Sequence, residues 1–311
     1  MRRRFIAEAL YRLSNLHRRM LVVYFAVIGP RWAYALTGWL ARVLYRVLDP
    51  VRLRSEAQCR AALKARVPAE DIPRIAEEAF VHRAWDFTDL YLADRLLHRG
   101  TYQQYGGAIP QPWLDRLLAA QGRGQPAILL TAYYGPFDLL PLLLGFNGVH
   151  CGAVYLSHRN LDYDAYRRRI RGRSGTELIP VRRATSRLPE ILEQGGTIAV
   201  VADHHVERRG LPVTFLGLPT QAMRTVGILA CRHNADVVVA DIRRVNQQFR
   251  FEVVIEDVID HTDWAGEPDP VAYITHRYLR AIETMILRDP TQYLWAQARW
   301  GKELANRLQE E

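Results

Sequence analysis

One segment of the chain combines an apolar run with residues that could carry chemistry. Residues 127–132 are largely apolar, and Tyr133, Gly135 and Asp138 follow them. The pattern predicts a buried strand that runs into a turn and then a helix. In an open α/β sheet, residues at that position face the ligand crevice beyond the carboxyl ends of the strands. This segment is therefore the first candidate for a functional site.

The sequence lacks the signatures of several common chemistries. No GxGxxG segment follows a strand and no GxxxxGK[ST] segment is present, so dinucleotide and P-loop sites are not expected. Ser174 belongs to a segment one residue short of the GxSxG nucleophile motif. His204 and His205 are adjacent and point apart on a strand or a helix, so we expect no metal site there. The three cysteines are widely separated, which fits a reducing compartment.

The elements that must position these residues alternate between strands and helices. Residues 51–121 have the apolar spacing of helices and predict a helical layer. In residues 122–311, short apolar runs predict strands at 127–132, 152–156, 178–181, 197–202, 237–242 and 251–255. Largely apolar runs are typical of parallel strands that are covered on both faces. We therefore expect an α/β fold in which helices cover a mostly parallel central sheet.

The N-terminal segment, residues 1–50, indicates contact with a membrane surface. Six of the first nineteen residues are arginines, and an apolar stretch follows them. Gly29 and Pro30 interrupt this stretch, whereas a spanning helix needs about 20 predominantly apolar residues. Trp32 and Trp39 among arginines are typical of the headgroup level. We expect a membrane-associated segment that lies in the interface, and the alternative is a helical hairpin packed on the rest of the domain.

The balance of charge indicates an anionic partner. The formal net charge is +9, and every basic residue except Lys64 and Lys302 is an arginine. The planar guanidinium group is well suited to phosphate. Neither a recognition helix nor a stacking motif accompanies the charge, so we do not expect a nucleic acid partner.

Four segments follow one another in the order seen in a known family. They are residues 133–138, 157–175, 203–219 and 293–300. Together they resemble the blocks of the bacterial lipid A late acyltransferases, the lauroyl and myristoyl transferases within the lysophospholipid acyltransferase group. The resemblance covers roughly residues 20–302. It implies a glycerolipid acyltransferase-like core at the cytoplasmic face of the bacterial inner membrane.

Two positions differ from the family pattern. Gly135 and Asp138 match the family motif H-x-G-x-x-E, but Tyr133 stands where the family has histidine. Gln297 replaces the histidine of the closing W-x-H-x-R-W. A tyrosine has an ordinary pKa of about 10, so at neutral pH it is a proton donor and not a base.

The resemblance implies transfer of a fatty acyl chain from an acyl thioester to a hydroxyl group of a lipid, such as a lipid A precursor or another lipid or lysolipid. In the family, the imidazole takes the proton from the hydroxyl group and the carboxylate orients the imidazole. The implied partners are membrane lipids and the thioester of acyl carrier protein or CoA, with no further cofactor and no metal. The choice of donor, the chain length, the acceptor and the oligomeric state stay open.

Three interpretations of the substituted site stay open. In the first, His204 or His205 supplies the base, because both follow a predicted strand beside Asp203 and strand ends converge at one sheet edge. His158 is the third candidate for that role. In the second, Tyr133 holds an oxyanion or a headgroup while the acidic residue of the motif acts alone. In the third, the protein binds acyl chains or lipids without turnover.

The remaining candidates would bind substrate. They are Gly135, His158, Arg159, Asn160, Arg171, Arg173, Asp203, Phe215 and Gly217. The arginines would bind phosphate groups of a lipid acceptor or of a phosphopantetheine donor, because charge-assisted bidentate hydrogen bonds suit that group. Phe215 could line an acyl groove, and Gly217 and Pro219 are expected to shape a turn.

Overall fold

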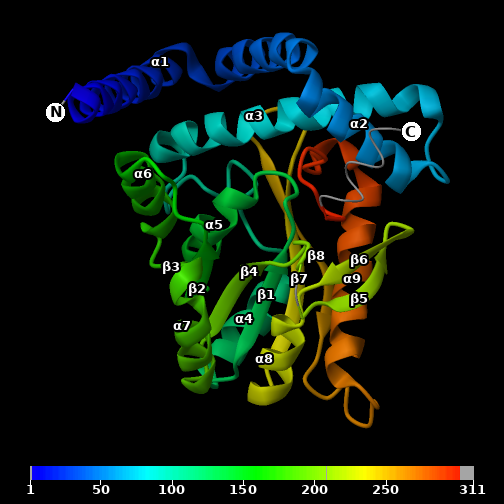
Figure 1. Ribbon diagram of the computed structural model, residues 1–311. Helices are drawn as coiled ribbons and strands as arrows, with labels where there is room; N and C mark the ends of the chain where they lie inside the picture. The colour runs from blue at the N-terminus through cyan, green and yellow to red at the C-terminus, as the bar shows by residue number, and fades with distance from the viewer. Residues whose placement is uncertain (1, 208, 302–311) are drawn as a thin grey trace.

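The computed structural model describes residues 2–207 and 209–301, without the side chains of residues 2–19, 21, 22 and 26 (Figure 1). The side chains of the arginines in the first nineteen residues, and residues 302–311 at the end of the predicted core, therefore lie outside the described part. In chain order the elements are α1 (Arg2–Val47), α2 (Asp49–Leu63), η1 (Ala69–Asp71), α3 (Ile72–Leu96), α4 (Gln111–Gly122), β1 (Ala127–Thr131), η2 (Phe137–Leu139), α5 (Leu140–Phe146), β2 (Cys151–Tyr155), α6 (Leu161–Gly172), β3 (Glu177–Pro180), α7 (Val181–Glu193), β4 (Thr197–Val201), β5 (Leu211–Phe215), β6 (Leu218–Ala222), α8 (Thr225–His233), β7 (Asp236–Arg244), β8 (Phe251–Ile259), α9 (Pro270–Arg288) and η3 (Pro290–Gln292).

A six-stranded sheet in the order β3-β2-β4-β1-β7-β8 forms the centre of the molecule. Strands β3, β2, β4, β1 and β7 run parallel, and β8 is antiparallel to β7. Each strand that the sequence predicts overlaps one of these six. Helices flank both faces, as Figure 1 shows, and the expected α/β fold with a mostly parallel sheet is confirmed.

The sheet brings the two candidate segments together. Strands β1 and β4 are direct neighbours, and their last residues, Thr131 and Val201, are paired in register. The backbone N–H of Ala202 donates to the carbonyl oxygen of Thr131, which extends the pairing one residue further. The chain segments that begin at Tyr133 and Asp203 therefore leave the sheet side by side.

The sequence analysis missed a small hairpin. Strands β5 and β6 pair antiparallel, and the turn between them consists of Leu216 and Gly217, both with positive φ. This conformation is typical of a two-residue turn that matches the twist of a hairpin. The expectation that Gly217 shapes a turn is confirmed. Pro219 lies instead within β6, where it pairs with Thr214, so its assignment to the turn was wrong.

Helices α1, α2 and α3 lie across the carboxyl ends of the parallel strands (Figure 1). Helix α3 contacts η2, η3 and α6, which all belong to that edge of the α/β core. Residues far apart in the sequence therefore meet there, because the helical layer closes the crevice that a parallel sheet leaves at this edge.

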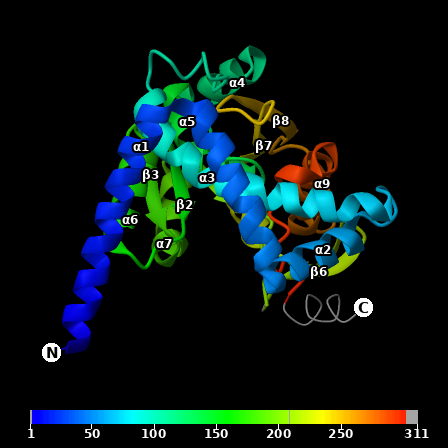
Figure 2. The same cartoon turned by 90° about the horizontal axis from the view of Figure 1, so that it is seen from above.

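Helix α1 bends at Gly29, whose φ is 75°, and Figure 2 shows its two halves meeting at an angle. Its inner face packs on α3, where the rings of Tyr34 and Trp85 stack at a centroid distance of 5.1 Å. Its outer face exposes large apolar side chains, including Trp32 at 67% and Trp39 at 59%. No helix in the described part of the chain is both long and apolar enough to cross a bilayer.

Arg244, the last residue of β7, connects the central sheet to helices α1 and α3 through hydrogen bonds. Its guanidinium group donates to the carboxylates of Asp86 and Asp89 on α3 and to the hydroxyl group of Tyr34 on α1. The side chain of Arg244 is fully buried, and it also lies over the ring of Trp85. Because buried charges are costly unless paired, this cluster holds α1 and α3 in one position on the sheet.

Candidate active site

Backbone hydrogen bonds join the turn after β1 to residues 292–294. The N–H of Gly135 donates to the carbonyl oxygen of Gln292, and the N–H of Leu294 donates to that of Tyr133. A Cβ atom on Gly135 would lie 2.1 Å from the carbonyl oxygen of Ile242, and its φ is +52°. Only glycine fits this close approach of two backbones. The backbone geometry of the turn therefore explains why glycine stands at this position of the family motif, and no contact between Gly135 and a substrate is needed to explain it.

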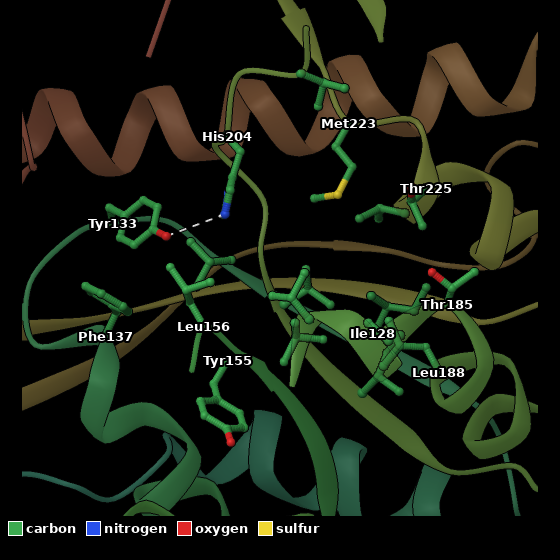
Figure 3. Close-up of a pocket in the computed structure, with 18 of the residues that line it drawn as sticks. Ile128, Tyr133, Phe137, Tyr155, Leu156, Thr185, Leu188, His204, Met223 and Thr225 are labelled. Atoms are coloured by element: carbon green, nitrogen blue, oxygen red, sulfur yellow. Dashed lines mark hydrogen bonds between the residues drawn. The ribbon is translucent and has the colours of Figure 1, made fainter. Parts of the chain in front are cut away.

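Tyr133 and His204 lie side by side at the carboxyl ends of β1 and β4 (Figure 3). The phenol oxygen is 3.5 Å from Nε2 of His204, and the ring centroids are 5.2 Å apart. Phe137 packs edge-on against the other side of the Tyr133 ring. The structure thus brings together the tyrosine of the motif and the first of the two histidines that the sequence offers as a base.

Asp203 fixes the backbone beneath this pair. One carboxylate oxygen accepts from the N–H of Tyr133 at 3.2 Å, and the other accepts from the hydroxyl group of Tyr293 at 3.0 Å. Asp203 is buried, and burial raises the pKa of its carboxyl group. It is absent from the cavity lining, so its contacts give it a positioning role for Tyr133.

Burial sets the protonation state of the pair. It lowers the pKa of His204 below 6.5, although the nearby carboxylate of Asp203 opposes the shift. It also raises the pKa of Tyr133 above 10, together with the charges of Asp203 and Asp138. At neutral pH the imidazole is therefore uncharged and the phenol keeps its proton. His204 can act as a base and Tyr133 as a hydrogen-bond donor.

Asp138 does not contact His204. Its carboxylate pairs with two arginines of α6, Arg167 at 3.3 Å and Arg171 at 3.4 Å. Burial alone would raise the pKa of Asp138, but Arg171, Arg167 and Arg83 lower it below its ordinary value. The acidic residue of the motif is thus ionised and acts as the counter-ion of an arginine cluster.

A cavity of about 880 Å³ extends from these residues along one face of the sheet, beneath α7 and α8. Its polar end holds Tyr133, Asp138, His158, Arg83, Arg167, Arg171 and His204. Its remainder is mostly apolar, and Figure 3 shows Leu156, Ile128 and Leu188 along its length. A ligand that combines a long apolar chain with a polar head group would match this division of the cavity into an apolar and a polar part.

The other predicted histidines line the cavity but are less well placed. Nδ1 of His205 lies 3.2 Å from the hydroxyl group of Thr220, and its ring lies against Gly301. His158 is exposed, and its Nδ1 accepts from the N–H of Asn160. Asn160 itself accepts from two N–H groups at the first turn of α6, so it caps that helix. Neither histidine forms a hydrogen bond with Tyr133 or His204 in the described structure.

Seven predicted binding residues lie outside the cavity lining. They are Gly135, Arg159, Asn160, Arg173, Asp203, Phe215 and Gly217. Arg173 donates to backbone carbonyl groups of Ala93 and Leu97 and to the carboxylate of Asp94, so it caps the end of α3. Phe215 is buried in the core with the guanidinium group of Arg299 over its ring at 4.3 Å.

The cavity also contains arginines that the sequence analysis did not select. Arg167 precedes Arg171 by one helical turn, so the two share a helix face, and this spacing was the available signal. Arg173 is only two residues beyond Arg171 and points elsewhere. Arg83 comes from α3, and no local pattern marks it, because only the packing of α3 over the sheet edge brings it to the site.

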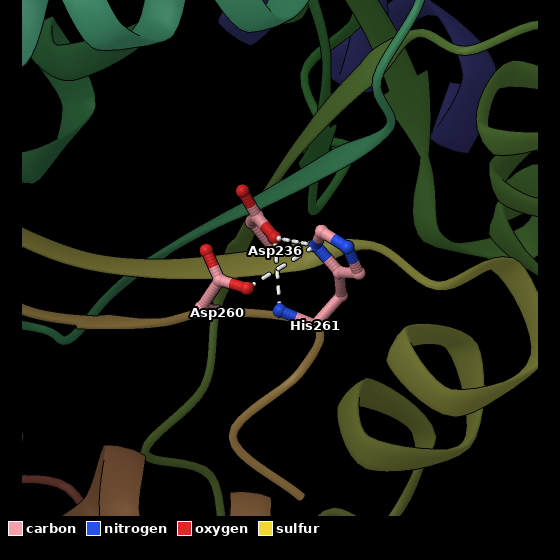
Figure 4. A group of neighbouring side chains, drawn as sticks. All are labelled: Asp236, Asp260 and His261. Carbon is pink, nitrogen blue, oxygen red and sulfur yellow. Dashed lines mark hydrogen bonds and ion pairs between the residues drawn. The ribbon is translucent and has the colours of Figure 1, made fainter. Parts of the chain in front are cut away.

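A separate group of possible metal ligands, Asp236, Asp260 and His261, lies at the opposite end of β7 and β8 (Figure 4). Their ligand atoms are within 4.8 Å of one another. Nδ1 of His261 is 2.8 Å from the carboxylate of Asp236, which also accepts from the N–H of His261. These hydrogen bonds join the start of β7 to the end of β8 and account for the arrangement.

The cavity combines four chemical capabilities. The uncharged imidazole of His204 can take a proton, and the phenol of Tyr133 can donate to a developing negative charge. The arginine cluster can bind an anion, and the apolar length can hold a hydrocarbon chain. Together they suit attack by a hydroxyl group on a carbonyl carbon that carries a long chain.

A family model described as bacterial lipid A biosynthesis acyltransferase matches residues 84–302. The match begins within α3, one residue after Arg83. It spans the whole central sheet and all the remaining residues at the polar end of the cavity. No sequence among curated proteins matches the chain.

Proposed function

This chain belongs to the bacterial lipid A biosynthesis acyltransferase family, and from that premise we propose that it moves a fatty acyl chain from a thioester of acyl carrier protein or CoA to a hydroxyl group of a lipid. The acceptor is a lipid A precursor or another lipid or lysolipid. The observation that carries the proposal is the cavity, in which an apolar channel ends at His204 and Tyr133. The acyl chain lies in the channel and the thioester carbonyl lies at that end.

In this proposal His204 replaces the histidine that the family motif places at position 133. Nε2 of His204 takes the proton of the acceptor hydroxyl group as its oxygen bonds to the carbonyl carbon. The hydroxyl group of Tyr133 turns from His204 to the carbonyl oxygen and stabilises the negative charge there. The carbon–sulfur bond then breaks, and His204 returns the proton to the leaving thiolate.

One observation favours a second function, binding of acyl lipid without turnover. Asp138 pairs with Arg167 and Arg171, and no carboxylate is hydrogen-bonded to His204 in the described structure. Nδ1 of His204 is buried without a partner there. In the Ser-His-Asp triad an orienting carboxylate contributes strongly to the rate, so a base without one works less well.

The acyl channel gives the first test of the proposal. Each methylene group that enters an apolar site contributes about 0.8 kcal/mol, which is about fourfold in affinity. Thiol release from a series of acyl thioesters, from butanoyl to dodecanoyl, should therefore show KM falling about fourfold per added methylene until the channel is filled. Ala184→Phe, which places a ring in the channel from α7, should raise KM for dodecanoyl and leave butanoyl unchanged.

Ser186→Phe is the matched control, because Ser186 is exposed on α7 and is not part of the cavity lining. It should leave the length dependence as in the wild type. Thiol release that is independent of chain length, or absent in the presence of every lipid acceptor, contradicts the assignment of this cavity to acyl transfer.

We also propose that the protein attaches to the cytoplasmic face of the inner membrane through the outer face of α1. Trp32, Trp39 and Val43 are spaced at seven and four residues, so they lie on one stripe of the helix, and all three are exposed. Changing all three to glutamine should move the protein from sedimented vesicles to the supernatant. Each lost apolar contact costs about 1.5 kcal/mol, roughly tenfold in partitioning.

The vesicles for this measurement contain phosphatidylcholine with phosphatidylglycerol, and Leu118→Gln on α4 is the control for an exposed apolar residue elsewhere. Truncation of the first 48 residues is a poorer test, because it removes the buried side chains of Ala33, Tyr34 and Ala41 from the core. Undiminished sedimentation of the triple variant would place the anchor on another surface.

A further inference from the structure

The polar end of the cavity concentrates positive charge. Arg83, Arg167 and Arg171 all line it, and their side chains are 32%, 17% and 5% exposed. The carboxylates paired with them are Asp138, which contacts two of the arginines, and Asp86, which contacts Arg83 at 3.1 Å. Asp86 also pairs with Arg244, which pairs in turn with Asp89, so four guanidinium groups face three carboxylates and one positive charge is in excess.

These arginines also have unused hydrogen-bonding capacity. A guanidinium group carries five N–H donors, and strong pairs with carboxylates have N–O distances of about 2.7 to 2.9 Å. Arg167 reaches both oxygens of Asp138 only at 3.3 Å, and Nε of Arg171 is buried with no partner in the described structure. Arg83 otherwise lies over the rings of Phe87 and Phe137.

The other residues that line the cavity do not neutralise the excess positive charge of the three arginines. Glu207 is the other acidic residue of the lining, but it is exposed and forms no ion pair with these three arginines in the described structure. His158 lines the same end of the cavity. A partly buried group of cations with free donors attracts an anion more strongly than an exposed group does, because the effective dielectric constant is lower.

We propose that Arg83, Arg167 and Arg171 bind a phosphate group of one substrate, and that Asp138 positions two of these guanidinium groups for it. The inference rests on the proposed acyl transfer and deepens it. It gives Asp138 a positioning role in anion binding, whereas the family motif places the acidic residue beside the base. Phosphate accepts bidentate hydrogen bonds from several arginines at once, which a carboxylate substrate does less well.

Inorganic phosphate is the first probe. Calorimetric titration of the full-length protein should detect binding, and Arg167→Gln and Arg171→Gln should each weaken it about tenfold. Arg168→Gln is the matched control, because Arg168 lies on the same helix but is exposed and pairs with Asp164. Arg167→Lys keeps the positive charge but lacks the planar guanidinium group, so it should bind phosphate with intermediate affinity. Thermal unfolding checks that each variant is folded.

Kinetics identify the substrate that carries the phosphate. If it is the donor, Arg167→Gln should raise KM for acyl-CoA and leave KM for the acyl thioester of N-acetylcysteamine, which has no phosphate, unchanged. If it is the acceptor, the rise in KM should appear with phosphorylated lipid acceptors and disappear with dephosphorylated ones. Asp138→Asn should raise the same KM and leave kcat near the wild-type value, as expected for a positioning residue.

The inference is overturned if folded Arg167→Gln and Arg171→Gln proteins bind phosphate as the wild type does, or if Asp138→Asn lowers kcat with KM unchanged. The proposed acyl transfer fails separately, if the wild type binds phosphate but releases no thiol from any donor with any lipid acceptor.

Discussion

Changing His204 to alanine is expected to lower kcat for acyl transfer by about 10²- to 10⁴-fold, because a positioned general base typically contributes that factor. His204 lies beside Tyr133 at the polar end of the cavity, with Nε2 3.5 Å from the phenol oxygen. The rate of thiol release at saturating thioester and lipid acceptor measures the loss.

The pH dependence of the wild type gives a second signature of this base. Burial lowers the pKa of His204 below 6.5, and the reaction needs the uncharged imidazole. Activity should therefore be constant at neutral pH and fall only as the pH drops below about 6.5, where the imidazole takes up a proton. Tyr133 keeps its proton throughout this range, because its pKa is raised above 10.

Three further variants separate the interpretations of the site. His205→Ala should reduce the rate less than His204→Ala, because the His205 ring lies against Thr220 and Gly301. Tyr133→Phe should also have the smaller effect, because His204 still supplies the base, and a loss equal to that of His204→Ala would show that the Tyr133 hydroxyl group contributes as much to the rate as the imidazole. An inactive wild type beside an active Tyr133→His protein would establish that the reaction was lost with the motif histidine.

Changing Arg244 to methionine is expected to lower the free energy of unfolding by about 3 to 5 kcal/mol, because it leaves buried carboxylates without their cation. Asp86 and Asp89 are both buried, and Arg244 contacts both. Arg243→Met is the matched control, since Arg243 precedes it on β7 and forms a partly exposed pair with Glu252. A pair of that kind contributes about 1 kcal/mol or less.

The stability of the Arg244→Met variant should improve as the pH falls. Burial raises the pKa of Asp86 to about 6 even with Arg244 beside it, and loss of this cation raises it further. The folded variant then binds protons more readily than its unfolded chain, so its stability rises as the pH drops from about 7 to about 5. Urea unfolding across this range should show the deficit relative to wild type shrinking, and a deficit that grows would contradict this account.

The amino-acid sequence by itself determined the strands of the central sheet and the edge of that sheet where the site lies. Apolar runs of five or six residues between helical segments identify parallel strands, since hydrophobic period and length are local properties of the chain. The residues that follow such strands must share one edge of the sheet. This reasoning predicts that His204 lies near Tyr133, and the structure places them together.

The tertiary structure decided which side chains complete the site. Asp138 pairs with Arg167 and Arg171 because α6 packs beside the turn after β1, and α3 supplies Arg83 from a distant part of the chain. Arg173 belongs to the same arginine-rich run, but its position on the helix directs it to the end of α3. All of these arginines have the same side chain and the same charge. Their positions around the helix and the packing of one helix on another decide which partners they contact.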